Sequence, residues 1–222
     1  MWSTGGIVIR SALAGLPPAG RAMLAAAVAL AMAGCSRPPV PYTDQIAAWH
    51  AEKDRFMRES SDSPVPADKR ATFPPLPYFP IDPAYRVPAS LQPVPAGSSL
   101  EMLTSTGQRR LMRRVGRLAF TVNGQTLTLG AFVEADQQDL RRLFVPFGDL
   151  TNGVETYNAG RYLELERTTT GFYDLDFNRA FHPFCLFNSS YDCPYPPPEN
   201  RLKLPIRAGE KLNTPKRAGA GQ

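Results

Sequence analysis

Residues 117–133, RLAFTVNGQTLTLGAFV, decide the fold, because they contain two strand-like segments joined by a turn signal. The dipeptide Asn123–Gly124 at their centre is the one that a two-residue type I′ β-hairpin prefers. This turn fixes the register, and both strands then agree on which face is buried. We therefore predict an antiparallel hairpin here. The opposed pairs are Phe120 with Leu127, Leu118 with Leu129, Thr121 with Thr126 and Ala119 with Thr128.

Further strands are predicted on the C-terminal side of this hairpin. Residues 143–147 are a continuous apolar run of strand length that ends at a Gly-Asp turn. Residues 161–167 and 172–177 alternate polar and apolar side chains around a Thr-Thr-Thr-Gly turn, which predicts a second hairpin. We expect the sheet to cover residues 98–178.

The stretch directly before the first hairpin, QRRLMRRVGR, is rich in arginine. One interpretation is a basic patch for phosphate groups or lipid headgroups. The other is an edge strand whose charges prevent pairing with another chain, and we favour this one. The residues concerned are Arg109, Arg110, Arg113, Arg114 and Arg117.

Proline shapes the segments on the N-terminal side of the sheet. The 222 residues include 23 prolines, which argues against a mainly helical protein. Residues 64–95 combine prolines with aromatic side chains, so we predict an arm that wraps the domain rather than a free arm that recruits a partner. Before it, Thr43 is expected to cap a helix over residues 43–59 with Trp49 on its apolar face. His50 lies beside that face and is expected to be solvated.

These features together predict a mainly β protein. We expect a single antiparallel sheet or barrel-like β domain over residues 42–208, with one N-terminal helix and a long proline-rich wrapping segment. Residues 209–222 are glycine-rich and basic without periodicity, so a disordered tail is expected. The formal net charge of +5 is too small to indicate nucleic acid as a partner.

The N-terminus has the layout of an export signal. Residues 23–33, MLAAAVALAMA, are uncharged and apolar and follow Arg10 and Arg21. This apolar segment is too short to span a bilayer as a helix. We therefore predict a signal peptide over residues 1–34.

The end of this signal resembles the bacterial lipobox. Residues 30–35 read LAMAGC, and the cysteine of a lipobox receives a diacylglycerol and becomes the first residue of the mature protein. We predict a lipidated Cys35, a tether over residues 35–41, and anchoring to the outer membrane on its periplasmic side. The alternative is an ordinary cut after Ala33, which leaves a soluble periplasmic or secreted protein.

Two cysteines lie late in the chain. Cys185 and Cys193 close a nine-residue loop in a chain that we expect to be exported, which favours a disulfide over residues 185–193. A metal site would add His182, but it needs a fourth ligand and has no standard spacing. A nucleophile pair of Cys185 and His182 is the third interpretation. We expect the disulfide, and no metal ion or cofactor.

Strand alternation places one arginine inside the domain. Leu163 and Leu165 must share a buried face, and Arg161 lies on that face too. A buried guanidinium without a partner is costly, so a carboxylate should meet it. Asp176 points away from it in the second hairpin. Glu155 is therefore the predicted partner.

The polar residues around this arginine form the candidate ligand-binding site. They lie on turns and strand ends, which commonly carry sites over a rigid sheet. A purely structural network and acid–base catalysis are the competing interpretations. The sequence has no glycine-rich phosphate loop, Gly-x-Ser-x-Gly elbow or paired CxxC to support catalysis. The residues are Asp149, Glu155, Tyr157, Arg161, Asp176 and Asn178.

Several motifs in the second half of the chain resemble one family. They are LFVPFGDLTNGVETYNAGRYL from residue 143, DFNRAFHPFC from residue 176, CPYPPPENRL from residue 193 and, upstream, YFPIDPAYRV. Together they are similar to the bacterial proteins grouped as domain of unknown function 1684, over roughly residues 55–211. Many members carry a tryptophan-rich insert and a further β-rich region, whereas here Ser60 follows the helix directly. The resemblance implies relatedness and no activity.

We expect from these features an exported, lipid-anchored envelope protein whose β domain binds a small ligand or an envelope partner without catalysis. The alternative is a hydrolase-like enzyme that uses carboxylates of residues 149–178, with Glu155 or Asp176 as general base. That alternative requires an open cleft holding two of the carboxylates Asp149, Glu155, Asp174 and Asp176.

Overall fold

The computed structural model describes residues 38–95, 97–136 and 141–213. The predicted signal peptide, Cys35 and residues 214–222 lie outside these ranges. The chain divides into two units, Met1–Val40 and Pro41–Gln222, and the fold described here is that of the second. Within the described ranges, no helix has the length and apolar character needed to cross a membrane.

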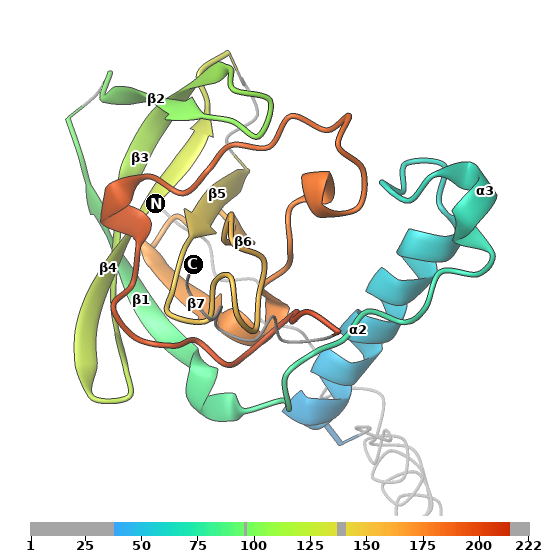
Figure 1. Cartoon of the computed structure of the whole chain (residues 1–222). Helices are drawn as coiled ribbons and strands as arrows, with labels where there is room; N and C mark the ends of the chain where they lie inside the picture. The colour runs from blue at the N-terminus through green and yellow to red at the C-terminus, as the bar shows by residue number, and fades with distance from the viewer. Residues whose placement is uncertain (1–37, 96, 137–140, 214–222) are drawn as a thin grey trace, which may run out of the picture. The chain divides into compact units, whose positions relative to one another are not determined.

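An antiparallel sheet of seven strands forms the centre of this unit (Figure 1). The strand order is β6-β5-β4-β3-β1-β7, and β2 pairs with β3 beside this path. The sheet curves like a barrel that is almost closed, with β6 and β7 as its two outer strands. The predicted mainly β, barrel-like fold is therefore confirmed. The strands are β1 Arg86–Pro93, β2 Ser99–Leu103, β3 Arg109–Val122, β4 Gln125–Glu134, β5 Arg142–Phe147, β6 Arg161–Glu166 and β7 Phe172–Asp176.

The β3–β4 hairpin has the predicted register. Phe120 lies opposite Leu127, and Leu118 lies opposite Leu129. The two residues of its turn have φ of 50° and 73°, the left-handed values that a type I′ turn requires. Leu118 and Leu129 are fully buried in the main core. Local alternation and turn chemistry were sufficient to predict this element.

The predicted second hairpin is wrong. β6 pairs with β5 and β7 pairs with β1, so the two strands lie at opposite ends of the strand order. Leu163 lies opposite Val145 and Leu175 lies opposite Val87, and each strand buries its apolar face this way. The short connection between β6 and β7 keeps them near each other without a ladder. Long-range partners with matching apolar faces therefore determined the pairing.

The proline-rich arm and the arginine-rich stretch both contribute strands inside the sheet. Residues 86–93 of the arm form β1, which lies between β3 and β7, so the sheet begins earlier than predicted. The arginines belong to β3, which has β4 on one side and β1 and β2 on the other, so the predicted edge strand is wrong. Arg110 pairs with Asp192 at 3.0 Å, and Arg114 pairs with Glu199. These arginines hold the segment around residues 191–200 on the outer face of the sheet.

Helix α2, Tyr42–Glu59, confirms the predicted helix. Thr43 is already inside the helix and does not cap it, because Pro41 occupies the cap position. His50 is not solvated as predicted, since its ring stacks on Tyr78 with centroids 3.6 Å apart. Its Nε2 lies 3.1 Å from the carbonyl of Asn178. His50 thus helps to dock α2 against the end of the sheet.

The C-terminal segment belongs to the fold beyond the predicted boundary. Glu210 is 1% exposed and bridges to Tyr78, although residues from 209 onward were predicted to be a disordered tail. Gly209 makes this path possible, because it has φ of 76° and a Cβ there would lie 2.5 Å from the carbonyl oxygen of Ala180. The sequence of this segment has no apolar period that could have predicted its burial. The remaining short helices are α3 Ala67–Arg70, η1 Pro83–Tyr85, η2 Phe177–Arg179, η3 Phe184–Leu186 and η4 Pro198–Asn200.

Candidate functional site

Arg161 lies at the centre of a buried polar network. Its side chain is fully buried. Nη2 donates to Asp149 Oδ2 at 2.9 Å and to the carbonyl of Ile206 at 2.6 Å. Nη1 donates to the carbonyls of Ala208 and Glu210, the latter at 3.1 Å. These hydrogen bonds offset the cost of removing the guanidinium from water.

Asp149, and not Glu155, is the carboxylate that meets this arginine. Arg161 begins β6 opposite Phe147, the last residue of β5, and Asp149 follows shortly after Phe147. The carboxylate therefore reaches back over the arginine. Glu155 binds Arg207 instead, with its Oε1 2.9 Å from Arg207 Nε. The inward position of Arg161 was predicted correctly, and its partner was predicted wrongly.

The environment of this ion pair is closed to solvent. The centroids of the Phe147 and Phe79 rings lie 5.3 and 5.9 Å from the guanidinium carbon. Burial lowers the pKa of Arg161, while the neighbouring Asp149 acts in the opposite direction. Both side chains of the pair are 0% exposed, so neither can meet a ligand from solvent. The pair is structural.

His182 and Glu210 form a second buried pair beside the first. The backbone N–H of His182 donates to Glu210 Oε2 at 2.7 Å, and His182 Nδ1 lies 3.4 Å from the same oxygen. The backbone N–H of Tyr157 donates to His182 Nε2 at 3.2 Å. Burial lowers the pKa of His182, so this network indicates a neutral imidazole with its proton on Nδ1. Because the Nε2 lone pair is occupied, His182 is neither a general base nor a metal ligand.

Asp176 and Asn178 join helix α2 to the sheet. Asp176 Oδ1 accepts hydrogen bonds from the Tyr42 hydroxyl at 2.8 Å and from the Asn178 backbone N–H at 3.0 Å. Asn178 Nδ2 donates to the Tyr42 hydroxyl and to the carbonyl of Asp82, both at 2.9 Å. Burial and the neighbouring Asp176 raise the pKa of Tyr42. The two residues therefore connect the helix, the arm and β7.

Cys185 and Cys193 lie side by side as free thiols. The backbone N–H of Cys185 donates to Cys193 Sγ at 3.2 Å. Hydrogen bonds from the Cys193 thiol and from the hydroxyls of Ser105 and Tyr157 lower the pKa of Cys185 to about 6. The pair thus combines a stabilised thiolate with a neighbouring thiol. Across the described ranges, no three His, Cys, Asp or Glu residues are arranged to hold a metal ion.

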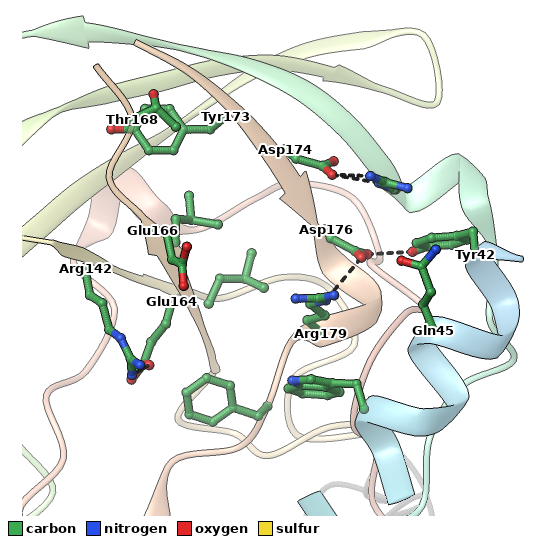
Figure 2. A pocket seen from close by; sticks show the side chains of 15 residues that line it. Tyr42, Gln45, Arg142, Glu164, Glu166, Thr168, Tyr173, Asp174, Asp176 and Arg179 are labelled. Carbon is green, nitrogen blue, oxygen red and sulfur yellow. Dashed lines mark hydrogen bonds and ion pairs between the residues drawn. The ribbon is translucent and has the colours of Figure 1, made fainter. Parts of the chain in front are cut away.

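A crevice of about 430 Å³ lies between β6 and β7, where the sheet does not close (Figure 2). Both faces of each strand line it: Leu165 and Glu166 are on opposite faces of β6, as Tyr173 and Asp174 are on β7. The crevice therefore lies beside the edges of β6 and β7 and not over one face of the sheet. Its other lining residues include Tyr42, Gln45, Trp49, Arg86, Arg142, Leu163, Glu164, Asp176, Arg179 and Phe181.

Charged pairs surround the opening of this crevice. Each of three arginines faces a carboxylate, and Glu166 adds a fourth acidic group (Figure 2). The pairs are Arg86 with Asp174 at 2.6 Å, Arg142 with Glu164 at 3.5 Å and Arg179 with Asp176 at 3.7 Å. Because all three arginines are at least 44% exposed, these pairs are weak and can exchange partners with a ligand.

Tyr173 lines this crevice and carries a buried hydroxyl. The residue is 5% exposed, and its buried hydroxyl has no hydrogen-bond partner in the described part of the chain. Tyr173 on β7 and Thr168, which follows β6, both line the crevice (Figure 2). A buried polar group without a partner costs about 1–3 kcal/mol. A polar ligand that reaches the hydroxyl from the crevice would remove this cost.

Only one of the predicted ligand-binding residues lines the crevice. Asp176 does. Asp149, Tyr157, Arg161 and Asn178 belong to the networks around Arg161, His182 and α2, and Glu155 pairs with Arg207 instead. Sequence reasoning missed the crevice because its walls come from α2, β1, β6 and β7. The one local signal was the alternation of Glu164 and Glu166 with leucines, which gives β6 an acidic outer face. The missed residues include Tyr42, Trp49, Arg86, Glu164, Glu166, Tyr173 and Arg179.

The fold and the crevice define a small antiparallel β domain whose barrel is almost closed. Residues 71–211 match the family described as "Protein of unknown function (DUF1684)", and the chain belongs to this family, as its motifs predicted. It is also similar to the uncharacterised protein from gene locus rrnAC0354 of Haloarcula marismortui, whose structure was solved by NMR. The identity is 38%, over 77% of this chain and 94% of that one, with a TM-score of 0.61. No curated protein matches.

The buried pair predicts a large difference between two acidic residues. Asp149→Ala leaves the Arg161 charge buried without its partner and should lower the free energy of unfolding by about 3–5 kcal/mol. Glu155→Ala is the matched control, since it removes an exposed pair and should cost about 0–1 kcal/mol. Urea unfolding followed by circular dichroism measures both. Equal losses for the two variants would contradict the assignment of Asp149 as the partner.

Proposed function

We propose that this protein is an exported, lipid-anchored protein of the cell envelope whose β domain binds a small polar ligand between β6 and β7. The observation that carries the binding role is the open crevice itself, which is lined by four acidic and three basic side chains and by Tyr173, whose hydroxyl has no partner among the described residues. A polar group on a ligand would supply the missing hydrogen bond. The volume of about 430 Å³ lies in the range of small-molecule sites.

The arrangement of the carboxylates supports binding over hydrolysis. Asp174 and Asp176 both line the crevice, so the cleft that a hydrolase needs is present. Asp176 Oδ1, however, already accepts hydrogen bonds from Tyr42 and Asn178. Asp174 Oδ2 is bound by both Nε and Nη2 of Arg86. Both carboxylates already have partners in the described part of the chain, which favours a binding role over that of a general base.

Export and anchoring rest on the N-terminal sequence. The apolar segment of residues 23–33 and the lipobox-like LAMAGC support removal of the signal peptide and lipidation of Cys35. An exported domain meets oxidising conditions, in which a disulfide oxidase can join Cys185 to Cys193. The low pKa of Cys185 supports this step, because the thiolate is the form that attacks a disulfide.

Tyr173→Phe tests the ligand site with two effects of opposite sign. Loss of the unpaired hydroxyl should stabilise the free protein by about 1 kcal/mol and weaken ligand binding about tenfold. The ligand comes from a thermal-shift screen of sugars, amino acids and nucleotides, and backbone NMR shifts map where it binds. Tyr191→Phe, on a tyrosine that does not line this crevice, is the control. Ligands whose shifts map away from Tyr173, or that bind Tyr173→Phe unchanged, would contradict the proposed site.

Export predicts two covalent changes in the mature protein. Protein extracted from membranes should begin at Cys35 with added diacylglycerol, and should carry a Cys185–Cys193 disulfide that blocks alkylation until it is reduced. Peptide mass spectrometry with and without reductant measures both. Cys35→Ala should release the protein from the membrane fraction while the disulfide remains. Wild-type protein in the soluble fraction would contradict the anchor, and two alkylated late cysteines would contradict the disulfide.

A further inference from the structure

Both strands that flank the crevice have an edge without a neighbouring strand. Among the strands that the structure describes, β6 has β5 as its one neighbour and β7 has β1. Arg167 N–H bonds to the carbonyl of Arg141, so the odd-numbered residues of β6 direct their backbone groups toward β5. The backbone groups of Glu164 and Glu166 therefore face the crevice. Within the described ranges, neither has a backbone hydrogen bond on that side.

The same reasoning applies to the opposite wall. Leu91 N–H donates to the carbonyl of Gly171 at 2.7 Å, so the odd-numbered residues of β7 direct their backbone groups toward β1. The backbone N–H and carbonyl of Asp174 consequently face the crevice. The crevice is thus bounded on both sides by main-chain donors and acceptors in strand conformation. A ligand that matches such a wall is another extended main chain.

A short ladder already exists at one end of this gap. Tyr162 and Phe181 exchange two backbone hydrogen bonds of 2.8 and 3.1 Å on the free side of β6. The ladder stops there, because the chain before Phe181 is the 3-10 helix η2, Phe177–Arg179. The free edge of β6 is therefore able to pair, and the chain itself leaves Glu164 and Glu166 without a partner.

The two ends of the gap limit the length of a bound chain. The Tyr162–Phe181 bridge closes one end, and the turn of residues 168–171 closes the other, where Thr168 Oγ1 donates to the carbonyl of Phe172 at 2.9 Å. Residues 163–166 lie between them, which corresponds to about 13 Å at about 3.3 Å per residue. The gap therefore fits about four residues and not a long strand.

The lining also specifies the side chains of such a peptide. Leu163, Leu165 and Tyr173 line the crevice from the core face, so alternate side chains of a bound strand would meet apolar surface on that side. The opposite face carries Glu164, which pairs with Arg142, and Glu166, whose added negative charge favours a basic or polar side chain. An extended peptide in which apolar and basic residues alternate presents one kind of side chain to each of these two faces.

We infer that the ligand of this crevice is a short extended peptide of about four residues, with apolar and basic residues alternating, which pairs with the free edges of β6 and β7. This inference rests on the proposed function, because it names the ligand class of the same site. Binding through the backbone distinguishes it from a sugar or nucleotide, which would use the side chains alone.

The test uses two acetylated tetrapeptide amides, Val-Lys-Val-Lys and Tyr-Lys-Val-Lys, titrated into the domain and followed by NMR shifts of Glu166 and Tyr173. Two N-methylated series of these peptides keep every side chain but lose backbone hydrogen-bond donors. One series is methylated on the backbone nitrogens of the lysines, and the other on those of valine and tyrosine. Because alternate N–H groups of the peptide point toward β6 and toward β7, each N-methyl series should bind more weakly than the parent, and at least one of them tenfold or more. A series that binds as tightly as the parent would overturn the inference.

Variants of the protein provide an independent measurement. Glu166→Pro removes a backbone N–H that faces the crevice and is tolerated at a strand edge, whereas the matched control Glu166→Ala keeps it. Glu166→Pro should bind the tetrapeptide at least tenfold more weakly than Glu166→Ala. If the tetrapeptides fail to bind while another small molecule shifts Tyr173, the peptide inference is overturned and the proposed function stands. If nothing shifts Tyr173, both are contradicted.

Discussion

The buried guanidinium of Arg161 is the constraint on which the rest of the structure depends. Burying a charge is unfavourable unless hydrogen bonds replace its water, and Arg161 obtains them from Asp149 and from the carbonyls of Ile206, Ala208 and Glu210. To supply these carbonyls, the C-terminal segment must pass over the end of the sheet. That path brings Glu210 to His182 and Tyr78, and so connects β6, the arm and the end of the chain in one polar network.

Strand pairing explains why the barrel stays open between β6 and β7. The start of β6 is fixed by Asp149 and by the Tyr162–Phe181 bridge. Beyond that bridge, β6 and β7 follow their own partners, β5 and β1, and no ladder joins them. The opening is therefore a regular consequence of strand pairing and not a packing defect. The fully buried charges hold the end of the sheet, and exposed ion pairs surround the crevice.

Sequence reasoning was successful where the deciding interactions are local. The turn Asn123–Gly124 and the alternation on both sides of it predicted the β3–β4 register, and alternation along β6 predicted that Arg161 faces inward. It failed where distant segments meet. The choice of Glu155 depended on a hairpin between β6 and β7 that does not form, and Glu210 lies in a segment without any period. The crevice could not be predicted, because no local pattern shows which edge strands stay unpaired.

Amide hydrogen exchange measured by NMR tests most directly whether the buried arginine holds the C-terminal segment in the fold. Ile206 N–H donates to Asp149 Oδ1 at 3.3 Å, and Glu210 N–H donates to the carbonyl of Ala180 at 2.8 Å. If the network is the structural centre, both amides exchange only through global unfolding, with the same protection as Leu118 in the hairpin core. Exchange of Ile206 and Glu210 at the rate of a frayed terminus, while Leu118 stays protected, would contradict the account.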